Sequence, residues 1–156
     1  AGKTMPQKQL DALLKKQLVD KATTMPKIEA KYNDVIATGA GKWGVAALVR
    51  LGEGYENLSA SLTNSYIPAY LTADQADLYK MALEDKAFPQ TEKAVNAYSE
   101  ALKKAYEFNL YDENTAEATR RLGVLRPADY PGLFEIVPAP SYSAPSEVSA
   151  SYEKQP

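Results

Sequence analysis

Residues 42–62 read KWGVAALVRLGEGYENLSASL, and this stretch decides the fold class. Its apolar residues recur at the spacing of one helix face, at Trp43, Ala47, Leu48, Leu51, Tyr55 and Leu58. Gly52 and Gly54 lie inside the pattern, where each glycine would cost an exposed helix about 1 kcal/mol. The two glycines therefore indicate either the close approach of a neighbouring helix or a kink.

The segment before residue 40 predicts two further helices. The first begins at Pro6, a favourable first-turn position because proline lacks the N–H that would be unpaired there. It carries leucines at helical spacing, at Leu10, Leu13, Leu14 and Leu18. The second begins at 24–26, a stretch that includes Pro26, and it ends at Gly39.

A loop and a fourth helix follow residue 63. Residues 64–71 contain Pro68 and predict an ordered loop. Thr72 is a candidate N-cap for the helix after it, and Gln75 would complete a capping box. We expect this helix to end at Phe88 and Pro89.

Two more helices complete the prediction. The fifth covers about 89–109, and the sixth is capped by Asp112 or Asn114 and ends before Pro127. No run of alternating β-branched residues predicts a strand. The sequence therefore predicts an all-α fold, with six helices in residues 1–125 that pair as antiparallel hairpins.

Apolar residues at tetratricopeptide offsets favour a stack of such hairpins. This repeat places large and small apolar residues at set positions in a helix–turn–helix of about 34 residues. One unit fits residues 78–111, through Leu78, Met81, Ala82, Ala94, Tyr98 and Ala101. The spacing is uneven, since Gly52 to Ala82 is 30 positions and Ala82 to Gly123 is 41. We predict a short tetratricopeptide-like α-solenoid, with a non-repeating helical bundle as the alternative.

The composition excludes several classes of chemistry. The 156 residues include no cysteine and no histidine, so disulfides, thiolate metal sites and nucleophile–histidine pairs are impossible. Glu53/Glu56 and Glu113/Glu117 are carboxylate pairs typical of solvated helix faces. We therefore name no catalytic, cofactor-binding or metal-ligating residue, and we predict that the chain is not an enzyme.

The charge distribution indicates which classes of partner the chain could bind. The net charge of −2 argues against nucleic acid. Residues 1–42 have a net charge of +4 from eight lysines and four acids, and the rest of the chain has −6. This asymmetry could steer a partner, although a solvated basic helix face is the simpler interpretation. No uninterrupted apolar run approaches the length of a membrane span.

Tyrosines are the first candidate partner-binding residues. The chain has eleven tyrosines and three phenylalanines, and tyrosine suits half-exposed surfaces because it buries a ring and keeps its hydroxyl wet. Tyr55, Tyr79 and Tyr98 lie on helical stripes, whereas Tyr66 and Tyr70 flank the loop proline. We predict that the first three bind a partner, as the concave surfaces of helical solenoids do, with core packing as the alternative for each.

Two arginines and the single tryptophan complete the candidates. Arg120 and Arg121 could bind an acidic peptide or a C-terminal carboxylate, and Arg121 can also pair with Glu117 four residues before it. Trp43 could anchor a ligand, but we favour a core position at the junction of the second and third helices. Gly39-Ala-Gly-Lys-Trp43 lacks the second half of a phosphate loop and follows a helix, so it predicts a turn.

The C-terminal residues divide into two segments. Residues 126–140, RPADYPGLFEIVPAP, are too apolar for a free linker, and we expect them to lie extended along the helices. Residues 141–156 are rich in Ser, Pro, Ala and Glu, which predicts a disordered tail or a segment that binds another protein.

Three stretches carry a resemblance to a known family. GAGKWGVAALVRLGEGYENL (39–58), LTADQADLYKMALEDKAFPQTEKAVNAYSEAL (71–102) and LYDENTAEATRRLGVLRPADYP (110–131) resemble the C-terminal region of large tetratricopeptide-repeat proteins of deltaproteobacteria. Some of those proteins belong to the gliding-motility machinery of myxobacteria. The resemblance implies a helical-repeat scaffold in the cell envelope, periplasmic in location, that is part of a longer polypeptide. It implies no catalytic residue.

Two functional hypotheses follow. The leading one is a non-catalytic scaffold that binds a protein or peptide in a multiprotein cell-envelope assembly of the motility type. The alternative is a helical domain that binds a small ligand or a cell-wall fragment, with Trp43 and the tyrosines stacking on it. The absence of cysteine is compatible with the cytoplasm as well as the periplasm.

Overall fold

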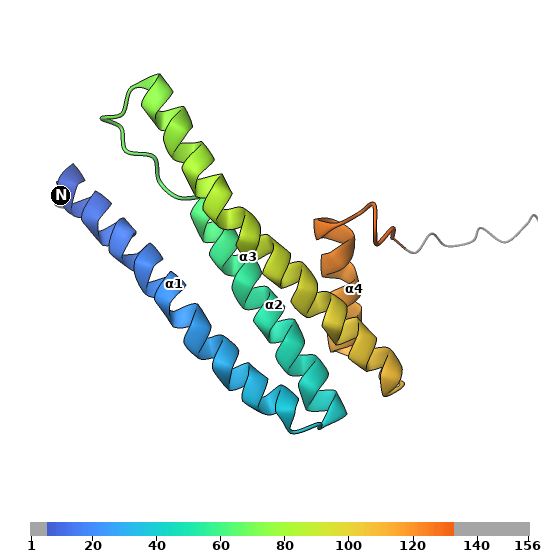
Figure 1. Ribbon diagram of the computed structural model, residues 1–156. Helices are drawn as coiled ribbons and strands as arrows, with labels where there is room; N and C mark the ends of the chain where they lie inside the picture. Colours follow the sequence, from blue (N-terminus) through green and yellow to red (C-terminus); the bar gives the residue numbers. More distant parts are fainter. Residues whose placement is uncertain (1–5, 133–156) are drawn as a thin grey trace, which may run out of the picture.

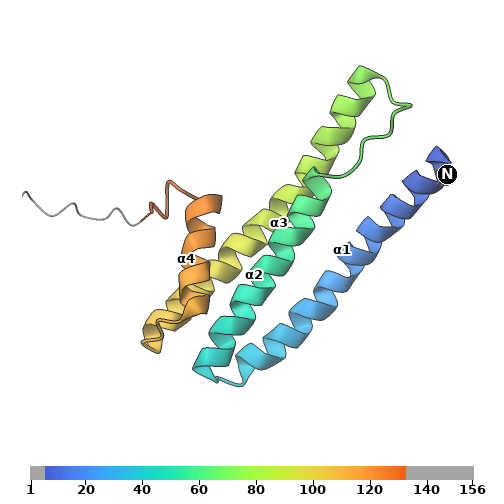
Figure 2. The ribbon, with the colours of Figure 1, turned by 180° about the vertical axis from the view of Figure 1, so that it is seen from behind.

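Four α-helices form the part of the chain that the computed structural model describes, residues 6–132, and that part contains no strand. They are α1 (Gln7–Ala37), α2 (Gly41–Thr63), α3 (Ala73–Glu107) and α4 (Glu113–Leu125). Figures 1 and 2 show α1, α2 and α3 side by side in one antiparallel layer, with α2 between the other two. The shorter α4 packs against α3 and α2. The predicted all-α class is confirmed, but the predicted number of helices is wrong.

The predicted boundary at Pro26 is absent because α1 continues through it. Proline inside a helix removes a hydrogen bond and costs about 3 kcal/mol. The stripe of apolar residues remains in register on both sides of the proline, since Leu18, Met25 and Ile28 all pack into the core beside α2. Tertiary packing therefore outweighs the local preference for a break.

The predicted boundary at Pro89 is absent for the same reason. Leu83 and Ala87 before the proline, and Ala94 and Tyr98 after it, all belong to the buried face of α3. Residues 78–107 of the predicted repeat unit consequently lie in one continuous helix with no turn between two shorter ones. A tetratricopeptide arrangement is not confirmed.

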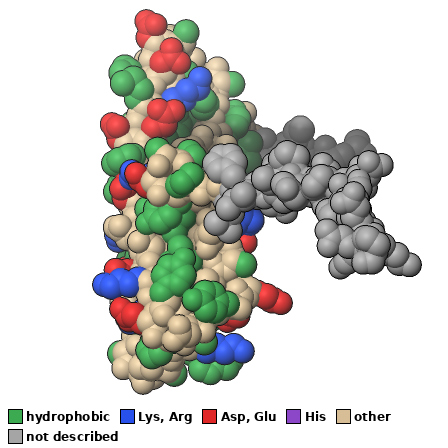
Figure 3. Space-filling model, turned by 90° about the vertical axis from the view of Figure 1, so that its right-hand side faces the viewer, with side chains coloured by type: hydrophobic (Ala, Val, Ile, Leu, Met, Phe, Trp, Pro, Cys, Tyr) green, Lys and Arg blue, Asp and Glu red, His purple; other side chains and the backbone are tan. Residues whose placement is uncertain are grey.

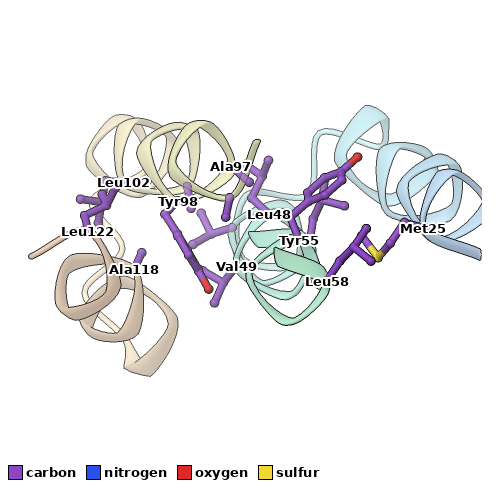
Figure 4. Packing of buried hydrophobic residues seen from close by; sticks show 14 of the residues in the cluster. Met25, Leu48, Val49, Tyr55, Leu58, Ala97, Tyr98, Leu102, Ala118 and Leu122 are labelled. Carbon is purple, nitrogen blue, oxygen red and sulfur yellow. The ribbon is translucent and has the colours of Figure 1, made fainter. Parts of the chain in front are cut away.

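The close approach predicted at the glycines of α2 is confirmed, and it occurs on two sides. A Cβ atom added at Gly52 would lie 2.7 Å from Cε1 of the Tyr98 ring, which belongs to α3. A Cβ atom added at Gly54 would lie 3.1 Å from Cε of Met25, which belongs to α1. Figure 4 shows Tyr98 and Met25 on opposite sides of α2. The two glycines therefore let α2 pack closely against both of its neighbours.

Two of the three helix starts predicted after residue 63 are confirmed, and the third, at about residue 89, is the false boundary at Pro89. Thr72 and Gln75 form the capping box at the start of α3. Asp112 caps α4 by accepting hydrogen bonds from the backbone N–H groups of Asn114 and Thr115, at 3.0 and 3.1 Å. Burial alone would raise the pKa of Asp112, but the hydrogen bonds that Thr115 and Asn114 donate outweigh it and lower that pKa.

The turn between α1 and α2 forms as predicted, but the predicted position of Trp43 is wrong. Gly39 has a φ of +71°, which suits glycine and reverses the chain between the two helices. Trp43 is 67% exposed. The buried face at the start of α2 comes from Val45, Leu48 and Val49 instead, and the Phe108 ring packs over Gly41.

The segment predicted to lie extended is described only up to residue 132. Its first residues form a turn, in which the N–H groups of Asp129 and Tyr130 donate to the carbonyl of Arg126 at 3.1 and 2.9 Å. Tyr130 packs against the core from there. Residues 133–140 and the predicted disordered tail, 141–156, lie outside the described residues, as do residues 1–5.

Candidate partner-binding groove

A groove crosses the C-terminal end of α2 between the first halves of α1 and α3. Its volume is about 450 Å³. We call it the tyrosine groove, and its main lining residues are Leu14, Lys15, Leu18 and Val19 of α1, Leu62 of α2, Tyr66, Pro68 and Tyr70 of the loop, and Tyr79, Leu83 and Lys86 of α3. Figure 1 shows this region at the upper left, where α1 and α3 flank the end of α2 and the loop.

Three tyrosines give the groove its amphipathic surface. Tyr66 and Tyr70 lie on either side of Pro68 in the loop, and Tyr79 lies in the second turn of α3. Tyr79 is 36% exposed and Tyr70 is 70% exposed. Gln7 at the start of α1 donates a hydrogen bond to the Tyr66 hydroxyl, which connects α1 to the loop.

The walls of the groove carry more positive than negative charge. Lys15 lies on the α1 wall and Lys86 on the α3 wall. Asp11 contributes the carboxylate among the lining residues of the described chain. The acids in the first half of α3, Asp74, Asp77, Glu84 and Asp85, are not among the lining residues. Ion pairs in the described part involve other lysines, namely Lys31, Lys80 and Lys103.

Tyr55 is a core residue that joins the three helices of the layer. Its hydroxyl lies 2.5 Å from Oε2 of Glu29 in α1 and 3.4 Å from Nζ of Lys93 in α3. The Lys93 ammonium also lies 4.9 Å from the centre of the Tyr55 ring. Burial, together with the hydrogen bond to Glu29, raises the pKa of Tyr55. Figure 4 shows the Tyr55 hydroxyl directed away from Leu58 and Met25.

Tyr98 is a core residue whose hydroxyl points to the opposite side of the layer (Figure 4). It donates to Oε2 of Glu56 at 3.0 Å. Burial, and then the nearby charge of Glu56, raise the pKa of Tyr98. The other oxygen of Glu56 accepts from Nη1 of Arg121 at 2.8 Å, so this network joins α2, α3 and α4.

The Glu117 carboxylate accepts hydrogen bonds from both predicted arginines on α4. Arg120 donates to it through Nε and Nη2, at 2.8 and 2.6 Å, and Arg121 donates through Nε at 2.8 Å. The hydrogen bonds from Arg120, and then the one from Arg121, lower the pKa of Glu117 to about 2. The predicted pairing of Arg121 with Glu117 is confirmed.

The five predicted partner-binding residues therefore lie in different environments. Tyr79 lies in the tyrosine groove, Tyr55 and Tyr98 lie in the core, and Arg120 and Arg121 are engaged with Glu117. Whether any of them binds a partner stays a prediction. Sequence reasoning did not select Lys15 and Lys86, because no local pattern shows that two lysines far apart in the chain face one groove.

A second groove lies on the other side of α1, between α1 and α2, with a volume of about 900 Å³. We call it the α1–α2 groove, and its apolar lining comes from Leu14, Leu18, Met25, Ile28, Leu58 and Tyr66. Lys21 crosses from α1 to α2, where its ammonium donates to Asn57 Oδ1 at 2.8 Å and to Ser61 Oγ at 2.6 Å. Leu14, Leu18 and Tyr66 line both grooves.

Two other kinds of site are absent from residues 6–132. No group of three or more acidic side chains there is arranged to hold a metal ion. No helix in that part of the chain has the length and apolar character needed to cross a membrane. Comparisons of the chain with protein-family models, with curated proteins and with solved structures find no match.

Proposed function

We propose that the chain is a non-catalytic protein-interaction scaffold whose tyrosine groove receives an apolar segment of a partner protein. The observation that carries the proposal is the set of tyrosines around the groove, Tyr66, Tyr70 and Tyr79, above an apolar floor at Leu62 and Leu83. Tyrosine supplies contact area with few rotatable bonds and keeps a polar hydroxyl at the rim, which is why it is enriched at binding surfaces.

The shape of the groove favours an amphipathic helix as the bound segment. Two helices, α1 and α3, form its long walls, and the end of α2 forms its floor. A partner helix can place a few apolar side chains into a groove of this kind, at positions three and four residues apart. Lys15 and Lys86 on opposite walls favour a helix with acidic residues beside its apolar stripe.

The cellular setting is a proposal that rests on the resemblance to envelope tetratricopeptide proteins. We propose that the scaffold acts in a multiprotein cell-envelope assembly of the motility type, in the periplasm, as part of a longer polypeptide. A cytoplasmic scaffold is the alternative. Fractionation of cells that carry a tagged chain would distinguish the two locations.

We also propose a helical-repeat arrangement in a modified form. The hairpins α1–α2 and α2–α3 are antiparallel neighbours that share α2, and further hairpins could extend this layer past α1. The length of α3 argues for a layer of long helices instead of the short paired helices of a tetratricopeptide unit. Small-angle scattering from a longer natural chain would measure whether the layer continues.

Crosslinking tests the groove directly. A photoreactive amino acid at position 70 should crosslink one envelope protein in near-stoichiometric yield, and Tyr79→Ala or Lys86→Glu should reduce that yield at least fivefold. Tyr111→Ala is the matched control, because Tyr111 is an exposed tyrosine that does not line the groove. Equal crosslinking by the Tyr79→Ala and Tyr111→Ala variants would disprove the groove as the site.

The α1–α2 groove favours the second candidate, a site for a small ligand. Its volume of about 900 Å³ lies within the range of small-molecule sites, roughly 300–1,000 Å³. A thermal-shift measurement with peptidoglycan fragments at millimolar concentration tests it. A shift that Ser61→Phe removes and Tyr79→Ala retains would support this candidate, and the absence of any shift would count against it.

A further inference from the structure

Apolar and acidic side chains form one stripe along the first half of α3. Successive positions in it are three or four residues apart, so they lie on the same face of the helix. We call it the α3 stripe, and its members are Asp74, Leu78, Met81, Asp85, Phe88 and Glu92. Leu78, Met81 and Phe88 are each at least 60% exposed. Figure 3 views the molecule from the side of α3 and α4, and it shows hydrophobic side chains with acidic ones between them along this side.

The α3 stripe points away from the tyrosine groove. Phe88 is nine positions from Tyr79, which lines that groove, and nine residues make two and a half turns of an α-helix. The two rings therefore leave α3 on opposite sides. The residues of the α3 stripe are not among those that line the tyrosine groove or the α1–α2 groove, so the stripe is a separate surface.

The face that carries the α3 stripe continues into an interface within the chain. Glu92 pairs with Arg126, the residue that follows α4. Seven positions after Glu92 on the same face, Ser99 accepts a hydrogen bond from the Tyr130 hydroxyl at 3.2 Å. Val95, between these two contacts, is partly buried against the core. From Glu92 onward this face of α3 thus contacts another segment, which places an arginine on its carboxylate, whereas positions 74–88 are exposed.

The exposed part of the stripe is negatively charged. The ion pairs among residues 6–132 do not include Asp74, Glu84 or Asp85. Glu84 and Asp77 lie beside the stripe, one position before Asp85 and Leu78. Asp77 lies 3.7 Å from the ammonium of Lys80. A partner that covers this surface therefore gains from bringing positive charge to it.

We propose that positions 74–88 of the α3 stripe bind a basic amphipathic helix of a partner protein. Spacings of three and four residues let one helix pack its apolar side chains between those of another. The 14-residue interval from position 74 to position 88 is about 21 Å long, which matches a partner helix of about four turns. Lysine or arginine side chains on the partner would face Asp74 and Asp85, as Arg126 faces Glu92 within the chain.

The same charges disfavour a second copy of the chain on this surface. An antiparallel pair of stripes that sets Met81 against the other copy's Phe88 brings the two Asp85 carboxylates close together, where they repel each other. The α1 helix of a second copy has an excess of lysine but no matching stripe. Its exposed apolar residues Leu13 and Val19 are six positions apart and do not share a face.

Two synthetic peptides test the proposal on the full chain. Both are about 15 residues long, or four turns, with leucines three and four positions apart. One carries lysine at the remaining positions and the other carries glutamate. In fluorescence anisotropy titrations the lysine peptide should bind at least tenfold more tightly than the glutamate peptide. Phe88→Gln should weaken binding of the lysine peptide at least tenfold, and Asp85→Lys should weaken it while strengthening binding of the glutamate peptide.

Tyr111→Gln and Glu107→Gln are the matched controls, because each changes an exposed side chain outside the stripe, and both should leave the affinity for the lysine peptide unchanged. Tyr79→Ala, in the tyrosine groove, should also leave it unchanged. Loss of binding in Tyr79→Ala but not in Phe88→Gln, or equal affinity for the two peptides, would overturn the proposal. A dimer of the chain alone in light scattering that Phe88→Gln dissociates would also overturn it, because a second copy would then cover the stripe.

Discussion

Gly52 and Gly54 are only two positions apart, yet they meet side chains from different helices. Residues at that separation point to different sides of a helix, so α2 presents one glycine to α3 and the other to α1. The distance from Gly52 to the Tyr98 ring is the shorter one, and the ring is held in the buried core. The most sensitive position for an added methyl group is therefore Gly52.

We predict that Gly52→Ala lowers the free energy of unfolding by about 1–3 kcal/mol, because overpacking outweighs the gain in helix propensity. Gly44→Ala is the matched control in the same helix. A Cβ atom at Gly44 would have no neighbour within 4 Å, so this variant should keep or raise the stability. Urea denaturation measures both, and equal stability of the two variants would contradict the assignment of close packing.

Glu117 makes the stability depend on pH. Its pKa falls from the ordinary value of 4.5 to about 2 in the folded chain. The stabilisation is therefore complete above about pH 4.5 and is lost as the pH falls through about 2. Since the Arg120 side chain is 55% exposed, solvent screening reduces the contribution to about 1 kcal/mol.

Glu117→Gln tests this pH dependence. The variant should be less stable than the natural chain at pH 7 and should approach it in stability at pH 2. Thermal unfolding at several pH values measures the difference, and Glu113→Gln on the same helix is the control. A difference that stays constant down to pH 2 would contradict the assigned ion pairs.

At the scale of the helices, the two internal prolines cost stability that the packing of α1 and α3 outweighs. Pro26→Ala and Pro89→Ala would each restore an N–H group in mid-helix, and each should raise the free energy of unfolding by about 1–3 kcal/mol. Pro6→Ala is the control, because Pro6 precedes the first turn of α1 and removes no internal hydrogen bond. Guanidinium denaturation measures all three, and a loss of stability in Pro89→Ala would show that the helix needs its proline.

The same helices show which parts of the fold the sequence could predict. Local signals such as the capping box at Thr72 and the cap at Asp112 gave correct starts, because the groups involved are within three residues of each other. Pro26 and Pro89 gave false boundaries, because the packing that overrides them comes from residues far along the chain. Helix periodicity identified the stripes but could not show which helices would be continuous.

Helix periodicity predicted only part of the candidate site. Tyr79 was selected from a helical stripe and does line the groove. Tyr55 and Tyr98 were selected in the same way and are buried, because periodicity cannot distinguish a ring in the core from one at a rim. The groove itself depends on how α1 lies beside α2 and α3. The sequence pattern of a single helix does not predict that arrangement.

At the scale of the whole molecule, α1 is the least firmly packed helix of the layer. Of its 31 residues, only Met25 is buried in the described structure, and residues between 11 and 28 line the two grooves on either side of the helix. Helices with few buried apolar contacts open at lower free energy than those in the core. The first half of α1 should therefore separate from the layer without unfolding of α2 and α3.

Hydrogen exchange measures this opening. Backbone amides of residues 10–24 should exchange at least tenfold faster than those of residues 94–105, which carry much of the buried face of α3. Leu62→Ala should speed exchange in α1 by weakening the floor of the tyrosine groove, whereas Tyr111→Ala should not. Equal protection of the two segments would show that the layer opens only as one unit.

The pair of glycines in α2 also has an evolutionary consequence. A larger residue at position 52 requires a smaller residue at 98, whereas a larger residue at 54 requires either a shift of the flexible Met25 side chain or a shorter residue at 25. Related sequences should therefore vary in step at 52 with 98 and at 54 with 25, but not in the crossed combinations. Such covariation would be evidence, independent of any structure, that α2 packs between α1 and α3.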